Sequence, residues 1–161
     1  MEIKVIKIKK NETDNIIIGQ AHFIKTVEDL YEVLITAMVD IKFGLAFSEA
    51  SGACLVRSEG NDNELKKLAE ENALNVGAGP AFYILLRDAY PINVLNAVKN
   101  TQEVCRVFCA TANPLEVLVA ESKLGRGIVE VIDGSSPRSV ETEEDIRWRK
   151  DLLRKIGYKR S

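Results

Sequence analysis

The alternation of apolar and polar residues along the chain predicts strands separated by helices. "EIKVIKIK" alternates with a period of two and "NIIIGQAHF" is more continuously apolar, and both patterns are typical of strands. Thr26 followed by Asp29 is typical of a capping box at a helix start. A helix is predicted over residues 26–40 because apolar residues recur there at helical spacing, at Val27, Leu30, Tyr31, Leu34, Ile35 and Met38.

The rest of the chain continues the same alternation. "KFGLAFSEA" and "ACLVRSE" are predicted strands, and "NDNELKKLAEENAL" is a predicted helix capped by Asn61 or Asp62. After the glycine stretch "NVGAGP", the pattern predicts a strand at "AFYILLRDA", a short helix opened by Pro91, and a strand at "EVCRVFCAT". Two strands, "EVLVAES" and "GIVEVID", and a last helix over residues 143–156 complete the prediction.

This order of elements predicts an α/β sandwich. Some consecutive strands are joined by short turns and others by helices, and this combination favours a mixed sheet. No linker, repeat or low-complexity tract divides the chain, and its 161 residues are about one domain by the usual length. We therefore expect one domain, residues 1–161.

Composition excludes several classes of protein. A formal net charge of −2 offers no basic field for nucleic acid. No apolar run approaches the ~20 residues of a membrane span, and the lysines of the first predicted strand interrupt the apolar core that a signal peptide needs. We expect a cytoplasmic protein that binds neither nucleic acid nor membrane.

The cysteines indicate neither a disulfide framework nor a metal site. They are Cys54, Cys105 and Cys109, an odd number without CxxC spacing in a chain that has one histidine. On a strand, Cys105 and Cys109 would share one face with Val107, which predicts that they serve packing. No metal ligand set is expected.

Motifs for nucleotide enzymes are absent, and this absence makes His22 the residue of interest. The chain has no GxxxxGK[ST] loop, no GxGxxG after a strand, no GxSxG and no HExxH. His22 lies between a predicted strand and a predicted helix, close to Lys25 and to the free amides of the first helical turn. Such a corner suits an anion, an imidazole can accept a phosphoryl group or pass a proton, and Gly19 lets a ligand approach the backbone. The alternative is a hydrogen-bonded histidine that ties the loop to the sheet.

Polar loops that follow predicted strands are further candidates. "SEASG" places Ser48, Glu49 and Ser51 just beyond a strand, where α/β proteins commonly bind ligands. Asn113 in "TANP" suits a hydrogen bond to a purine or ribose, although an Asn-Pro turn is the simpler explanation. A solvated turn is the favoured explanation of "SEASG" as well.

The loop "DGSSP" adds the last pair of candidates. Asp133 suits ribose hydroxyls or a cation, and Gly134 gives the backbone the freedom that a tight turn needs. A plain type I or type II turn explains the same residues.

Seven segments of the chain carry a family resemblance: "IIIGQAHFIKTVEDLYE", "KFGLAFSEASGACLVR", "GNDNELKKLA", "YPINVLNAVKNTQEV", "CATANPLEV", "GRGIVEVIDGSSP" and "LLRKIGYK". In order, they resemble those of the adenosine-specific kinase family, a small and mainly archaeal family. The resemblance runs from about Ile16 to Lys159 and implies a three-layer α/β/α sandwich that assembles as a homotrimer or a multiple of one. It also implies adenosine or AMP as ligand and a phosphorylated histidine.

The resemblance implies that His22 carries the phosphoryl group and that Lys25 and the other candidates line the pocket. In the mechanism that this favours, Lys25 would stabilise the transferring oxygens, and Glu49 or Asp133 would position the ribose hydroxyl. Magnesium is the one cofactor considered, because phosphoryl transfer needs charge neutralisation. The alternative is a non-catalytic adenosine or AMP sensor, since this chain has Pro80 where the family often has a histidine. The residues expected to line the pocket are Gly19, Ser48, Glu49, Ser51, Asn113, Asp133 and Gly134.

Overall fold

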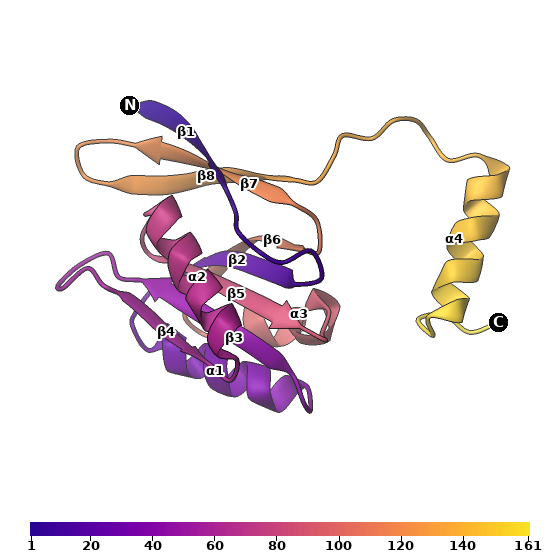
Figure 1. Ribbon diagram of the computed structural model, residues 1–161, viewed down its shortest axis with the longest axis horizontal. Coiled ribbons are helices and arrows are strands. Elements are labelled where there is room, and N and C mark those ends of the chain that lie inside the picture. Colours follow the sequence, from indigo (N-terminus) through magenta and orange to yellow (C-terminus); the bar gives the residue numbers. More distant parts are fainter.

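A computed structural model describes residues 1–161 as eight strands and four helices (Figure 1). The predicted elements are present, at boundaries that differ by a few residues. The strands are β1 (Glu2–Lys7), β2 (Asn15–Ala21), β3 (Lys42–Ser48), β4 (Val56–Gly60), β5 (Ala81–Arg87), β6 (Val104–Thr111), β7 (Leu115–Glu121) and β8 (Arg126–Asp133). The helices are α1 (Thr26–Ala37), α2 (Asn63–Val76), α3 (Pro91–Lys99) and α4 (Glu143–Lys155).

The strands form two sheets, and all neighbouring strands are antiparallel. The larger sheet has the order β4-β3-β5-β2-β6 and the smaller one the order β1-β7-β8. The predicted mixed sheet is therefore wrong. The helical crossovers do join strands of the same direction, but each skips one strand: β5 lies between β2 and β3, β3 between β4 and β5, and β2 between β5 and β6. An antiparallel strand thus separates every parallel pair.

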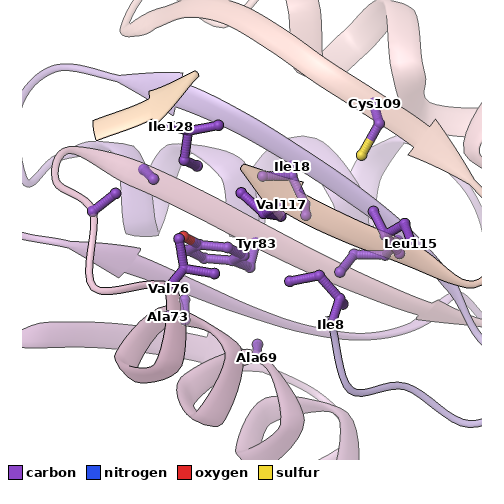
Figure 2. Close-up of a cluster of buried hydrophobic side chains, with 14 of the residues drawn as sticks. Ile8, Ile18, Ala69, Ala73, Val76, Tyr83, Cys109, Leu115, Val117 and Ile128 are labelled. Carbon is purple, nitrogen blue, oxygen red and sulfur yellow. The ribbon is translucent and has the colours of Figure 1, made fainter. Parts of the chain in front are cut away.

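Helices cover both faces of the five-stranded sheet, as expected, and the small sheet adds to one of them. Helices α1 and α3 pack on one face, over a cluster that includes Leu30, Phe43 and Val94. Helix α2 and the three-stranded sheet share the other face. Figure 2 shows Tyr83 of β5 close to Val76 of α2, with Val117 of β7 in the same cluster. The second sheet is a departure from a simple three-layer sandwich, because its strands pair with each other and not with the larger sheet.

Two of the predicted helix starts are confirmed and one is wrong. The Asp62 side chain caps α2 by accepting the amides of Glu64 and Leu65, and Pro91 opens α3. The expected cap Thr26 is instead the first residue of α1, because the N-cap position falls on Lys25. The Thr26 side chain is buried, and its hydroxyl donates to the Phe23 carbonyl at 2.7 Å.

Two β-bulges in β6 overturn the predicted common face of the cysteines. Ile18 pairs with Cys109, but its neighbour Gly19 pairs with Val107, so one residue of β6 is extra between them. Cys109 consequently packs in the cluster under α2, whereas Val107 packs in the cluster under α1. Cys105 is exposed, next to the second bulge. Strict alternation fails wherever a bulge inserts a residue.

Helix α4 stands apart from the rest of the chain. Residues 134–142 between β8 and α4 form neither helix nor strand, and Figure 1 shows them carrying α4 away from both sheets. None of the residues of α4 is buried. None of the four helices has the length and apolar composition that crossing a membrane would require.

Candidate functional site

One edge of the five-stranded sheet collects several of the predicted residues. Strands β2 and β3 are both antiparallel to β5, so their carboxyl ends meet at the same edge, beside the amino ends of β5 and β6. The loop after β2 carries His22 and Lys25, and the loop after β3 carries Glu49. Only β5 separates β2 from β3, so these two loops start about 10 Å apart.

His22 is presented to solvent by a strained loop. Its amide donates to the carbonyl of Glu103 at 3.0 Å, and its side chain is exposed. The next residue, Phe23, has a φ of 82°, a backbone conformation that costs a non-glycine residue energy. The Phe23 ring is also 61% exposed. A strained backbone next to an exposed imidazole and an exposed aromatic ring is typical of a binding site.

Lys25 is engaged by two carboxylates. Its ammonium forms ion pairs with Asp29 and with Glu103, the latter at 2.8 Å. These two hydrogen bonds, the one to Asp29 first, raise the pKa of Lys25 above its ordinary value. The cluster of one ammonium and two carboxylates carries a formal charge of −1, so Lys25 is not a free cation awaiting a phosphate.

The first-turn amides of α1 are not all free for an anion either. The Thr26 amide donates to the Phe23 carbonyl at 3.1 Å and the Val27 amide to the Ile24 carbonyl at 3.3 Å. The predicted corner of free helix amides is therefore wrong for these two groups. The physical reason is a tight turn before the helix, which supplies carbonyl partners from the loop itself.

Glu103 is a site residue that the sequence did not reveal. Its side chain is only 5% exposed, one oxygen pairs with Lys25, and the other, Oε2, has no hydrogen-bond partner. A buried polar atom without a partner costs free energy, which is typical of a group that awaits a ligand or a solvent molecule. Nothing in "TQEVCRV" separates this glutamate from a surface one, because Lys25 lies 78 positions away.

A cavity of about 480 Å³ opens beside this loop. Its volume is within the usual range for small-molecule sites. It combines an exposed ring, aliphatic side chains and cationic groups of both the loop and β4. The lining residues are Phe23, Ile24, Lys25, Val27, Glu28 and Arg57.

The loop after β3 is anchored to the cavity wall by Glu49. One carboxylate oxygen accepts the Leu55 amide at 2.9 Å and the other pairs with Arg57 at 3.0 Å. The hydrogen bond from the Leu55 amide, together with Arg57, lowers the pKa of Glu49 below its ordinary range. Glu49 thus orients Arg57, another cavity residue that the sequence did not single out.

The other predicted residues of this edge differ in their surroundings. Ser48 is buried and its Oγ has no partner, and Ser51 is exposed in the loop. Gly19 is buried in β2, where an added Cβ would overlap the ring of Phe82. Its missing side chain therefore makes room for packing within the sheet.

Asn113, Asp133 and Gly134 meet at the opposite edge. The Asp133 carboxylate accepts hydrogen bonds from Thr111 at 2.7 Å and from Asn113 at 3.1 Å. Strand β6 begins at Val104, at the His22 edge, and ends at Thr111, in this cluster. The length of the strand therefore places the cluster about 20 Å from the His22 edge. Within one chain, the loops that carry Asn113 and Asp133 are brought together with each other and not with His22.

Comparisons with known proteins identify the family. The family model described as "Adenosine specific kinase" matches residues 6–159. The crystal structure of the PH1918 protein from Pyrococcus horikoshii OT3 is 47% identical, with a TM-score of 0.96 over 99% of each chain. No curated protein matches the chain. These matches agree with the family resemblance of the segments from Ile16 to Lys159. The chain belongs to the adenosine-specific kinase family.

Proposed function

We propose that the chain binds adenosine or AMP in the cavity beside His22 and transfers a phosphoryl group through that histidine. The observation that carries the proposal is the position of the chain's only histidine, exposed directly before the residues that line a cavity of about 480 Å³. The family match makes adenosine the first ligand to consider.

The cavity has the chemistry that a nucleoside requires. An exposed aromatic ring such as Phe23 is a stacking surface for a purine, and such stacking is worth about 1–3 kcal/mol per base. Arg57 is held by Glu49 and offers donors to a phosphate or to ribose oxygens. Lys25 is tied to two carboxylates, so in this proposal it orients the loop and Arg57 is the nearer cation for a phosphate.

The transfer has two steps. A neutral imidazole nitrogen of His22 attacks the terminal phosphorus of a nucleoside triphosphate, forming an N–P bond and releasing the diphosphate. The 5′-hydroxyl of adenosine then attacks the phosphorus, the N–P bond breaks and its electron pair returns to the imidazole. The hydroxyl proton leaves to a carboxylate or to water. Two in-line steps explain how the chain does without a phosphate-binding loop motif.

At this edge of the sheet, Mg²⁺ would bind together with the nucleotide and not to the protein alone. Mg²⁺ is usually held by one or two carboxylates together with substrate phosphates. Asp29 and Glu103 are the carboxylates that pair with Lys25 of the loop, and Glu103 Oε2 has no partner in the chain. When bound, the ion would offset the negative charge of the transferring phosphoryl group.

A sensor of adenosine or AMP is the second candidate. One observation favours it: Lys25 is already neutralised by carboxylates. In this alternative His22 donates a hydrogen bond to the ligand and forms no covalent bond. Turnover distinguishes the two candidates.

The experiment measures binding and turnover on the same preparations. Calorimetry with adenosine and AMP gives affinity, and chromatography of adenosine plus ATP with Mg²⁺ gives product. Intact mass before and after acid treatment detects a phosphohistidine. For His22→Ala we expect adenosine affinity within about threefold of the parent, no product and no acid-labile phosphate. Thr13→Ala, exposed at the other end of β2, is the matched control.

The outcomes separate the candidates. Turnover that persists in His22→Ala overturns the histidine mechanism. Binding without turnover in the parent protein supports the sensor. Phe23→Ala should weaken adenosine binding by about 5- to 150-fold through lost stacking, and an unchanged affinity would place the ligand elsewhere.

A further inference from the structure

Every cation that lines the cavity of the candidate site is already paired with a carboxylate. The two cationic lining residues are Lys25 and Arg57. The ammonium of Lys25 pairs with Asp29 and with Glu103. The guanidinium of Arg57 pairs with Glu49 at 3.0 Å. Both cations are therefore neutralised by the chain itself before any ligand arrives.

The charged groups around the cavity have a negative sum. Glu28 also lines the cavity, and its carboxylate is exposed. With the three carboxylates that hold the cations, it makes four negative groups against two positive ones, a formal charge of −2. The hydrogen bond from Lys25 lowers the pKa of Asp29, so this carboxylate stays ionised at neutral pH.

The amino end of helix α1 does not reverse this sign. A helix terminus contributes about half a positive charge. The first turn of α1 carries Glu28 and Asp29, and its Thr26 and Val27 amides already donate to carbonyls of the loop. An anion at this end of the helix therefore meets more negative charge than positive charge.

A nucleoside and its monophosphate differ in the property to which such a cavity responds. Adenosine is uncharged, whereas a phosphate monoester carries close to −2 above its second pKa of about 6. Stacking on Phe23 and hydrogen bonds from Arg57 to ribose oxygens would serve both ligands equally. Repulsion acts on the monophosphate alone: in water, a dianion about 6 Å from one net negative charge loses about tenfold in affinity.

We propose that the cavity selects the neutral nucleoside over its monophosphate, and that Asp29 determines this preference by holding Lys25. Glu103, the other carboxylate on Lys25, also anchors the loop through its main-chain oxygen. The Asp29 side chain is 26% exposed and its one ion pair is with Lys25, so removing its charge releases the ammonium toward a phosphate. The inference rests on the binding part of the proposed function and does not depend on turnover.

The preference would assist product release if the cavity also phosphorylates adenosine. The product gains two negative charges at a place that already carries a net negative charge. Repulsion then favours its departure, and the next uncharged adenosine enters without this cost.

Calorimetry with adenosine and AMP tests the preference on the parent protein. Titrations near pH 8 without divalent cations keep the phosphate a dianion and leave its charge uncompensated. At roughly 0.02 M NaCl, we expect adenosine to bind about tenfold more tightly than AMP. Raising NaCl to roughly 0.5 M screens the repulsion, so AMP should gain about threefold in affinity while adenosine changes by less than about twofold.

Asp29→Asn tests the residue that determines the preference. With Lys25 left on one carboxylate, the ratio of adenosine affinity to AMP affinity should fall by about tenfold. Glu12→Gln removes the same charge at an exposed position before β2, whereas the site lies beyond the end of that strand, and it should leave the ratio unchanged. Circular dichroism confirms that each variant is folded, and the salt dependence of the parent protein decides even if Asp29→Asn does not fold.

A double variant shows whether the released ammonium carries the effect. Asp29→Asn combined with Lys25→Gln removes one negative and one positive group, so the ratio should return to that of the parent protein. A ratio that stays as low as in Asp29→Asn would overturn the role of Lys25.

The outcomes separate this inference from the proposed function. An AMP affinity that equals or exceeds that of adenosine, or that falls as NaCl is added, overturns the inference while adenosine binding stands. An unchanged ratio in Asp29→Asn overturns the role of Asp29. Phe23→Ala should weaken both ligands alike, because they share the stacking surface. Loss of neither ligand in Phe23→Ala, or no adenosine binding by the parent protein, overturns the proposed site and this inference with it.

Discussion

The buried carboxylate of Glu103 lies 2.8 Å from the ammonium of Lys25, and the main-chain oxygen of the same glutamate accepts the His22 amide at 3.0 Å. Glu103 therefore holds the loop at two points, on either side of the strained Phe23. The conformation of the loop that carries His22 and the cavity residue Phe23 therefore depends on a residue just before β6, far along the chain.

Glu103→Gln tests how much this anchor contributes. The change keeps the shape of the side chain and removes the charge that pairs with Lys25. Because Lys25 is 48% exposed and water screens the pair, we expect a loss of only about 1 kcal/mol in the free energy of unfolding. Urea denaturation measures it. Glu28→Gln, at an exposed position of the same cavity, should change stability by less than about 0.5 kcal/mol. Equal losses for the two variants would contradict the anchor.

The lowered pKa of Glu49, in the loop after β3, makes the stability of the folded protein depend on pH in the acid range. Its pKa is lowered in the folded state by the Leu55 amide and Arg57, so its stabilisation is present above the ordinary value of 4.5 and is lost as the pH falls through the folded pKa. We expect the melting temperature of Glu49→Gln to fall less between pH 5 and pH 3 than that of the parent protein. The exposed Glu12→Gln is the control. Parallel curves for all three proteins would show that Glu49 does not contribute.

Gly44 allows α2 to approach the five-stranded sheet. A Cβ at this position would lie 2.5 Å from the Cα of Lys66 and would overlap the backbone of the first turns of α2. We expect Gly44→Ala to lower the free energy of unfolding by about 1–3 kcal/mol, because a helix backbone cannot turn aside as a side chain does. Gly127→Ala in β8, where a Cβ meets no atom within 4 Å, should be nearly neutral or stabilising. Thermal or urea denaturation of both variants decides the matter, and a neutral Gly44→Ala would contradict this packing.

Local rules were sufficient for most of the elements. The period of the apolar residues located the strands and helices, Asp62 was identified as a cap, and Pro91 as a helix opener. These features depend on residues a few positions apart, and α4 was predicted for the same reason, since Trp148, Leu152 and Ile156 recur at helical spacing. Its capping box of Thr142 and Asp145 was not identified from the sequence. The sequence segments also indicated the family that the comparisons show. The roles of His22 and the other candidate residues stay predictions.

What the tertiary structure decided was which distant residues meet. Strand order placed an antiparallel strand inside every helical crossover, which no single crossover reveals. The same order brought Glu103 to Lys25 and separated Asp133 from His22 by the length of β6. Pairing between strands far apart in sequence depends on the whole core and not on local preference, and a single bulge in β6 was enough to reverse the face of a side chain. Sequence by itself thus determined the elements and their chemistry, and the fold determined which of them share an edge.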